Sequence, residues 1–225
     1  MRVRMSRVAF GALLAGVGYV AATWYRYGLT RPAAGGDELL DRYMPAYDVR
    51  ERHETRVKAP AEVTFAAARA LELGRSPVIR AIFRGRELLM SSTARTAKPP
   101  RPFLDEVLAL GWRVLAEEPD CEIVVGAVTQ PWLADVVFRG IAPEEFAGFD
   151  EPDYVKIAWT LAVAPLGPDE SVFRTETRVM TTDPSSRRKF RRYWAVFSPG
   201  ILLIRRETLR LVKRAAEARV VAGAK

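Results

Sequence analysis

The sequence of 225 residues contains a single cysteine and a single histidine. One cysteine excludes an intrachain disulfide and a cluster of thiolate metal ligands. Cys121 begins the apolar run 121–128, so we expect a small core residue rather than a nucleophile, which needs an electropositive and partly exposed setting. Metal-ligand spacings, glycine-rich phosphate loops and Gly-x-Ser-x-Gly motifs are also absent. These absences predict no metal site, no cofactor and no known catalytic motif.

Acidic residues are fewer than basic ones, with 27 Asp and Glu against 35 Lys and Arg, which leaves a net charge of +8. Almost all the basic residues are arginine, whose guanidinium suits phosphates, carboxylates and anionic lipid headgroups. A GC-rich genome explains the same bias toward arginine and alanine without any function. With 49% hydrophobic and 28% charged residues, we expect one folded domain with an ordinary core, preceded by an extra N-terminal segment.

One uncharged apolar run, Val8–Trp24, follows three arginines near the N-terminus. At ~1.5 Å per residue its roughly 17 residues reach about 26 Å, slightly short of the ~30 Å hydrocarbon core. The aromatic residues at its end suit a membrane interface, so we expect an uncleaved single-pass anchor. A secretory signal has the same basic start, and Val20–Ala22 is a passable cleavage site. Arg2, Arg4, Arg7 and the amino terminus precede the run, and Arg26, Arg31 and Arg42 follow it. This balance of positive charge slightly favours a domain outside the cytoplasm.

The chain divides into four predicted parts. Residues 1–27 form the anchor or signal segment, and residues 28–46, which begin with small and helix-breaking residues, form a linker. Residues 47–219 form the folded domain, and residues 220–225 form a tail.

Two strands with alternating side chains precede the C-terminal helix. Residues 154–164 alternate apolar side chains with a second set, as in a strand with one buried face. The next strand carries Phe173, Thr175, Thr177 and Val179 on one side and Arg174, Glu176 and Arg178 on the other. We expect the first set to face the core and the charged set to face water.

Proline recurs at positions where a helix begins, where its missing N–H group costs nothing. The expected elements are a strand over 47–57, helices over 60–71 and 76–89, two or three strands within 112–138 that include 112–117 and 121–130, a short helix from 143, and a final helix from 184 with a kink at Ser198 and Pro199. Strands that follow one another by short turns pair antiparallel, so the fold class is α+β.

Apolar residues keep helical spacing along the final helix, and basic residues occupy much of the rest. The apolar set is Phe190, Tyr193, Trp194, Phe197, Ile201, Ile204, Leu209 and Val212. The basic set is Arg187, Arg188, Arg192, Arg205, Arg206, Arg210 and Lys213. We expect the apolar set to meet the sheet and the basic set to face solvent or an anionic membrane. Nucleic acid is not an expected partner, because the aromatic rings face the sheet and offer no stacking platform.

The strand Arg50–Lys58, interrupted by Ala59-Pro60-Ala61-Glu62 before a helix, resembles the opening of the SRPBCC or helix-grip superfamily. This superfamily includes START domains, polyketide cyclases and the birch-pollen allergen type. The later strands and the long helix extend the resemblance over about Tyr47 to Ala218, and Phe190–Arg206 looks like part of an uncharacterised bacterial branch. The resemblance implies a curved antiparallel sheet wrapped around the C-terminal helix, with an apolar cavity between them. No catalytic motif of a characterised branch matches this sequence.

The resemblance also implies where a hydrophobic ligand binds. The residues expected to line the cavity are Ile157, Trp159, Leu161, Phe173, Thr175 and Thr177 from the strands and Trp194, Phe197 and Ile201 from the helix. Aromatic residues at such spacing more commonly fill a core, and that interpretation stays open.

Two further groups of residues have alternative interpretations. His53 shares a strand face with Glu51 and is either a general base or an exposed strand residue. The acidic residues around Phe146 and Phe149 form a lid, a cation site or an ordinary solvated loop. This acidic set is Glu144, Glu145, Asp150, Glu151 and Asp153.

Three functions fit these observations. The favoured one is a membrane-tethered protein that binds or transfers a lipid or another hydrophobic small molecule. The second is a structural or interaction protein with a filled core. The third is an enzyme of the cyclase or hydrolase type that uses the same cavity.

Overall fold

The computed structural model describes residues 16, 18–19, 21–23, 31–32, 37–91 and 101–223. Within these residues, no helix has both the length and the apolar character that a membrane crossing requires. Most of the run Val8–Trp24 lies outside the described residues, so the membrane anchor stays a prediction.

The described chain alternates between strands and helices and ends in one long helix. In order, the elements are β1 (Arg31–Pro32), α2 (Glu38–Tyr43), β2 (Ala46–Tyr47), β3 (Val49–Val57), α3 (Ala61–Arg69), η1 (Leu73–Arg75), α4 (Pro77–Met90), α5 (Phe103–Ala109), β4 (Arg113–Glu118), β5 (Glu122–Thr129), β6 (Phe138–Arg139), α6 (Pro143–Phe146), β7 (Val155–Gly167), β8 (Glu170–Thr181) and α7 (Pro184–Gly223). The expected elements are therefore present, with β6 at the end of the range 112–138, while β1, α2, η1 and α5 add to them.

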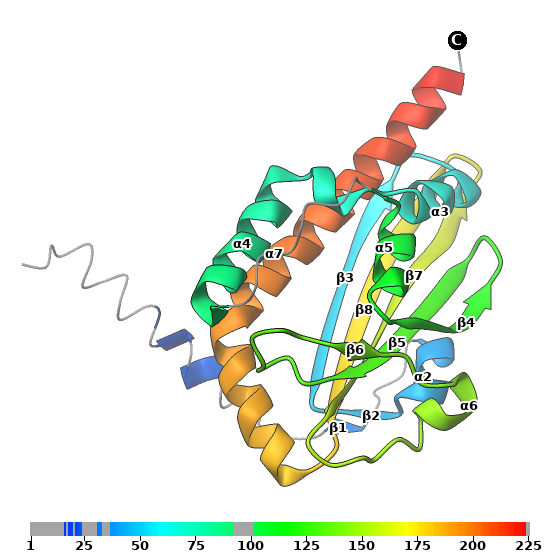
Figure 1. Ribbon diagram of the computed structural model, residues 1–225. Helices are drawn as coiled ribbons and strands as arrows, with labels where there is room; N and C mark the ends of the chain where they lie inside the picture. The colour runs from blue at the N-terminus through cyan, green and yellow to red at the C-terminus, as the bar shows by residue number, and fades with distance from the viewer. Residues whose placement is uncertain are drawn as a thin grey trace, which may run out of the picture.

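The main sheet has the strand order β3-β8-β7-β5-β4, with β6 paired to β5, and all its pairs are antiparallel. Figure 1 shows α7 running along one side of this sheet, with α3 and α5 over the same region and α4 beyond α7. A curved antiparallel sheet against a long terminal helix is the helix-grip arrangement, so the predicted α+β fold is confirmed.

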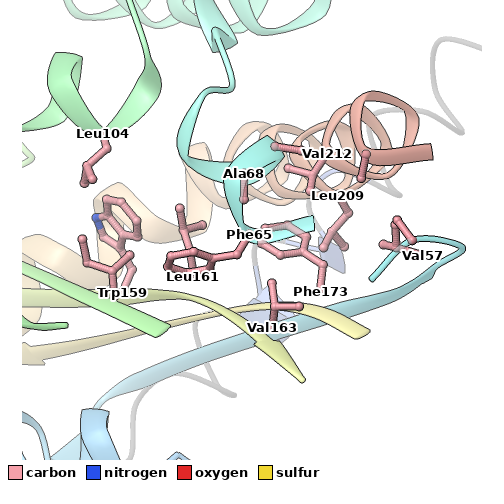
Figure 2. Packing of buried hydrophobic residues seen from close by; sticks show 14 of the residues in the cluster. Val57, Phe65, Ala68, Leu104, Trp159, Leu161, Val163, Phe173, Leu209 and Val212 are labelled. Atoms are coloured by element: carbon pink, nitrogen blue, oxygen red, sulfur yellow. The ribbon is translucent and has the colours of Figure 1, made fainter. Parts of the chain in front are cut away.

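We call the sheet face toward α7 the inner face. Its apolar cluster includes Phe65 of α3, Trp159 and Phe173 of the strands, and Leu209 and Val212 of α7. Figure 2 shows these side chains pointing toward one another from the sheet and the helices. At roughly 25 cal/mol per Å² of buried apolar surface, this packing is the main force that holds α7 on the sheet.

The opposite, outer face is also covered, by α2 and α6. Leu40 and Met44 from the end of α2 are buried against Val124 and Ala158 of the strands, together with Phe146 of α6. The range 28–46 was predicted to be a linker. Because α2 lies within it and packs on the sheet, at least this part belongs to the folded domain.

Local signals in the sequence explain where the helices begin. Ser76 caps α4 by accepting a hydrogen bond from the Ile79 amide at 3.5 Å, and Pro77 occupies the first turn. Asp183 accepts hydrogen bonds from the amides of Ser185 (2.6 Å) and Ser186 (3.1 Å) at the start of α7. A hydrogen bond from the Asp153 amide, together with these two bonds, lowers the pKa of Asp183 to about 2.

The final helix is continuous over 40 residues, from Pro184 to Gly223, and includes Pro199. Proline lacks the amide that would bond to the preceding turn, so a bend is expected there rather than an end. Figure 1 shows α7 changing direction along its course. The helix also extends through most of the predicted tail.

Candidate functional site

A band of polar side chains crosses the inner face of the sheet. Glu51 and His53 of β3 pair directly with Thr177 and Thr175 of β8. Directly opposed residues of an antiparallel pair point to the same side, which here is the side of Phe173 and therefore of α7.

Apolar clusters lie on both sides of this band. On one side is the cluster around Phe173 and Leu209. On the other side, Val49 and Val179 pack with Phe190 and Trp194 from the first half of α7. Along α7, the inner face therefore has an apolar zone, then the polar band, and then a second apolar zone.

Arg205 meets the band from α7. It lies four residues after Ile201 and four before Leu209, on the helix stripe that packs against the sheet. Its Nε atom is buried and has no hydrogen-bond partner among the described residues. Burial lowers the pKa of Arg205 to about 10, and the charge of Glu51 offsets only part of this effect. The prediction that Arg205 faces solvent was therefore wrong, because its position on the helix wheel places it inside.

His53 is half-buried on the inner face, so the interpretation as an exposed strand residue is also wrong. Burial lowers the pKa of His53, the positive charge of Arg205 lowers it further, and Glu51 opposes both. These effects together favour the neutral form of the imidazole. Its Nδ1 atom is buried and has no hydrogen-bond partner within the described ranges. A general base usually has a partner that orients it, so this geometry gives the catalytic interpretation no support.

The nine residues predicted to line a cavity all lie on the inner face or on α7. Trp159, Leu161 and Phe173 are packed in the larger apolar cluster. The two threonines belong to the polar band, and Trp194 stacks on Phe190 with ring centroids 5.6 Å apart. Three residues are only partly buried, namely Ile157, Phe197 and Ile201. Their contact with a ligand remains a prediction.

Two hollows lie elsewhere on the protein. One of about 270 Å³ is lined by Gln130, Leu133, Val137, Arg139 and Tyr154. The other, of about 110 Å³, is lined by Cys121, Glu122, Ala162, Val163, Ala164, Val172 and Arg174. Neither contains any of the nine predicted residues. Cys121 itself is exposed, which contradicts its predicted place in the core, because it lies at the turn before β5.

The charged side of β8 is buried, which contradicts the prediction that it faces water. Arg178 is 0% exposed and donates hydrogen bonds to Glu176 (2.8 Å), Asp41 (2.5 Å) and the Met44 carbonyl (2.9 Å). Arg50 adds a second pair with Glu176 at 2.8 Å. The strand pattern was correct, but the covering helix α2 was not predicted, and α2 supplies the partners that make burial of this charge tolerable.

A second charged group on the outer face joins the start of α2 to the sheet. Arg174 contacts Asp37 at 3.3 Å and Glu122 at 3.9 Å. Burial, together with the neighbouring Asp37, raises the pKa of Glu122 to about 8. One proton is therefore held within this carboxylate pair at neutral pH.

The acidic residues of α6 and of the loop before β7 either pair with basic side chains of the protein or face solvent. Glu151 pairs with Arg139 at 2.5 Å, and Asp153 pairs with Lys189 at 2.5 Å. Glu144, Glu145 and Asp150 are exposed. The interpretation as a solvated loop fits best.

No family model and no curated protein matches the sequence. Solved structures with a related shape include the di-domain aromatase/cyclase BexL (15% identity, 75% of this chain and 46% of that chain, TM-score 0.33). Others are norcoclaurine synthase from Thalictrum flavum (13% identity, 85% and 96%, TM-score 0.36) and a START superfamily protein from Mycobacterium smegmatis (15% identity, 77% and 97%, TM-score 0.27). The chain thus spans about half the length of the di-domain protein.

At such low identities and TM-scores, these comparisons carry no argument about this chain. The helix-grip arrangement is supported by the chain's own antiparallel sheet and by α7.

Proposed function

We propose that the protein binds an amphiphilic small molecule or lipid between the sheet and α7, and that Arg205 holds the acidic head of this ligand. The observation that carries the proposal is the inward position of Arg205, whose Nε is buried without a hydrogen-bond partner among the described residues. A ligand with an apolar body and an anionic head matches the sequence of apolar and polar zones along the inner face.

The energetic argument concerns the cost of a buried charge. The lowered pKa of Arg205 expresses a penalty on the charged form, because one pKa unit corresponds to about 1.4 kcal/mol. A carboxylate or phosphate that accepts hydrogen bonds from the guanidinium removes this penalty, and such charge-assisted bonds are the strong ones. The neutral His53 and the band threonines add further polar neighbours.

The apolar part of the ligand needs space that the packed core does not offer around Trp159 and Phe173. Partly buried side chains next to the band, Ile201 and Phe197 of α7, are the ones that can move aside. Binding therefore begins at the middle of α7, where Pro199 already weakens the helix.

Membrane tethering is the second part of the proposal and rests on the apolar run Val8–Trp24. The domain would then lie outside the cytoplasm. Cys121 is the single cysteine and is exposed, so a membrane-impermeant maleimide should label it in intact cells. Labelling that appears only after lysis would place the domain on the cytoplasmic side.

The ligand proposal is tested by titrating the protein with dodecanoate, dodecyl phosphate and dodecanol, followed by native mass spectrometry. We expect the two acids to bind and the alcohol to bind at least tenfold more weakly. The Arg205→Met variant should lose this preference, whereas Arg206→Met, which alters an exposed neighbour, should keep it. Tighter binding of dodecanoate or of dodecyl phosphate would show whether the head of the natural ligand is a carboxylate or a phosphate.

A structural or interaction protein with a filled core is the second candidate. The tight packing of Trp159, Leu161 and Phe173 in the larger cluster favours it. In that case, none of the three compounds binds at any concentration below micelle formation.

A further inference from the structure

Two helices leave apolar side chains exposed on the side of the domain away from the sheet. We call these residues the α4–α7 surface. It consists of Val78 (45% exposed), Leu88 (81%) and Leu89 (73%) of α4 and Val196 (55%) and Leu203 (49%) of α7. Five large apolar residues on two adjoining helices are more than the single exposed ones that a soluble surface commonly carries.

Packing between the helices makes this one surface. Ile82 lies against Gly200 at the point where α4 crosses α7, and Ser76 donates a hydrogen bond to Glu207 at 3.1 Å. Val196 and Leu203 are seven residues apart, so they share one face of α7. Trp194 packs against the sheet, and Leu203 follows it by nine residues, which is about half a turn out of phase. Leu203 therefore points away from the sheet.

The predicted membrane segment meets the domain on α7 as well. Tyr19, near the end of the apolar run, forms a hydrogen bond of 2.9 Å with Ser198 of α7. Ser198 is 1% exposed and follows Trp194 by four residues, so this contact lies on the sheet-facing stripe of α7 and not on the face of Val196 and Leu203. The described part of the N-terminal segment therefore does not cover the α4–α7 surface at this contact.

The charge of the surface is also suited to a membrane. Arg80 and Arg84 of α4 and Arg192 and Arg206 of α7 are exposed. The nearest carboxylate on α7, Glu207, is already paired with Arg210 at 2.5 Å. Exposed arginines among apolar side chains are typical of surfaces that lie at the interface of an anionic bilayer.

We propose that the α4–α7 surface docks on an anionic phospholipid bilayer, with Leu88 and Leu89 inserted at the level of the headgroups. This inference goes beyond the proposed ligand binding, since it concerns the opposite side of α7 from Arg205. Helix α7 would then separate the bilayer from the polar band, and it would be the element through which a membrane-derived amphiphile reaches its site.

The test measures the depth of single positions in the full chain. Cys121→Ser removes the only cysteine, and Leu88→Cys or Leu166→Cys then adds one for an NBD label. Leu166 is the control, because it is 50% exposed at the turn between β7 and β8. Both proteins are reconstituted into nanodiscs of phosphatidylcholine with 30% phosphatidylglycerol, with or without a doxyl-labelled lipid.

We expect doxyl lipid to quench the label at position 88 at least twofold more than the label at position 166. Discs of phosphatidylcholine alone should reduce the quenching at position 88. Equal quenching at both positions overturns the docking surface, and equal quenching in both types of disc overturns its preference for anionic lipid. A blue-shifted emission at position 88 without doxyl quenching also overturns the proposal, because a second copy or another protein then covers the surface.

Discussion

Arg205 occupies a helix position that a residue selected only for stability would not fill with a charge. It belongs to the buried stripe of α7, between Ile201 and Leu209, and its pKa is lowered by burial. Natural proteins often retain such residues where a ligand supplies the missing partner, at a cost in stability. A substitution of Arg205 therefore distinguishes a ligand-binding role of this residue from a structural role.

We predict that Arg205→Met raises the free energy of unfolding of the ligand-free protein by about 1–3 kcal/mol. The reason is that methionine keeps most of the apolar contacts of the side chain and removes the buried charge. Chemical denaturation measures the effect. Arg206→Met is the control and should change stability by less than about 0.5 kcal/mol. Destabilisation by Arg205→Met would instead indicate a structural pairing with Glu51.

Glu122 makes stability depend on pH in a direction opposite to that of most carboxylates. Its folded-state pKa of about 8 lies above the ordinary 4.5, so the folded state holds a proton that the unfolded state has lost. Stability from this group is complete below pH 4.5 and falls as the pH rises to about 8.

Glu122→Gln keeps the neutral form at every pH. We expect the loss of stability between pH 5 and pH 8 to be smaller in this variant than in the unaltered protein, by about 1–3 kcal/mol. Urea unfolding at a series of pH values gives the comparison. Parallel curves for the two proteins would show that the proton is not held at Glu122.

At the scale of elements, Gly111 ends α5 and allows β4 to begin. Its φ of 101° is in the region that favours glycine, and a Cβ atom there would lie 2.3 Å from the carbonyl oxygen of Phe138. Both strain and collision oppose a side chain at this position.

We predict that Gly111→Ala lowers the free energy of unfolding by about 2 kcal/mol or more. Gly85 in α4 is the matched control, since a Cβ atom there has no neighbour within 4 Å. Gly85→Ala should stabilise the protein by about 0.5–1 kcal/mol, because alanine restricts the unfolded chain. Thermal unfolding of both variants tests the contrast, and similar effects would contradict it.

At the scale of the whole molecule, the sheet is a central layer with a core on each side. The inner core holds α3, α5 and α7, and the outer core holds α2 and α6. The domain therefore includes α2 at its N-terminal end. This helix packs the segment that follows the predicted anchor against the outer face of the sheet.

Leu40→Ala tests whether α2 is part of the folded unit. Leu40 is 0% exposed, so the truncation should cost about 2–4 kcal/mol through lost contacts and the resulting cavity. Leu166→Ala, at an exposed turn, should cost little. If residues 28–46 behaved as a tether throughout, both variants would unfold at the same denaturant concentration.

Local patterns in the sequence determined the strands and most helices. Alternation identified the inner faces of β7 and β8, and the residues Ser76, Pro77 and Asp183 marked helix starts, because these signals act over a few neighbouring residues. The order of these elements also determined the α+β class and the resemblance to the helix-grip fold.

Only the tertiary structure decided which faces are covered. The charged side of β8 is buried because α2, far away in the sequence, lies over it with Asp41 and Leu40. Arg205 and His53 face inward because α7 approaches β3 there, at a contact of residues about 150 positions apart. Alternation shows that a strand has two sides, but the burial of each side depends on partners that come from elsewhere in the chain.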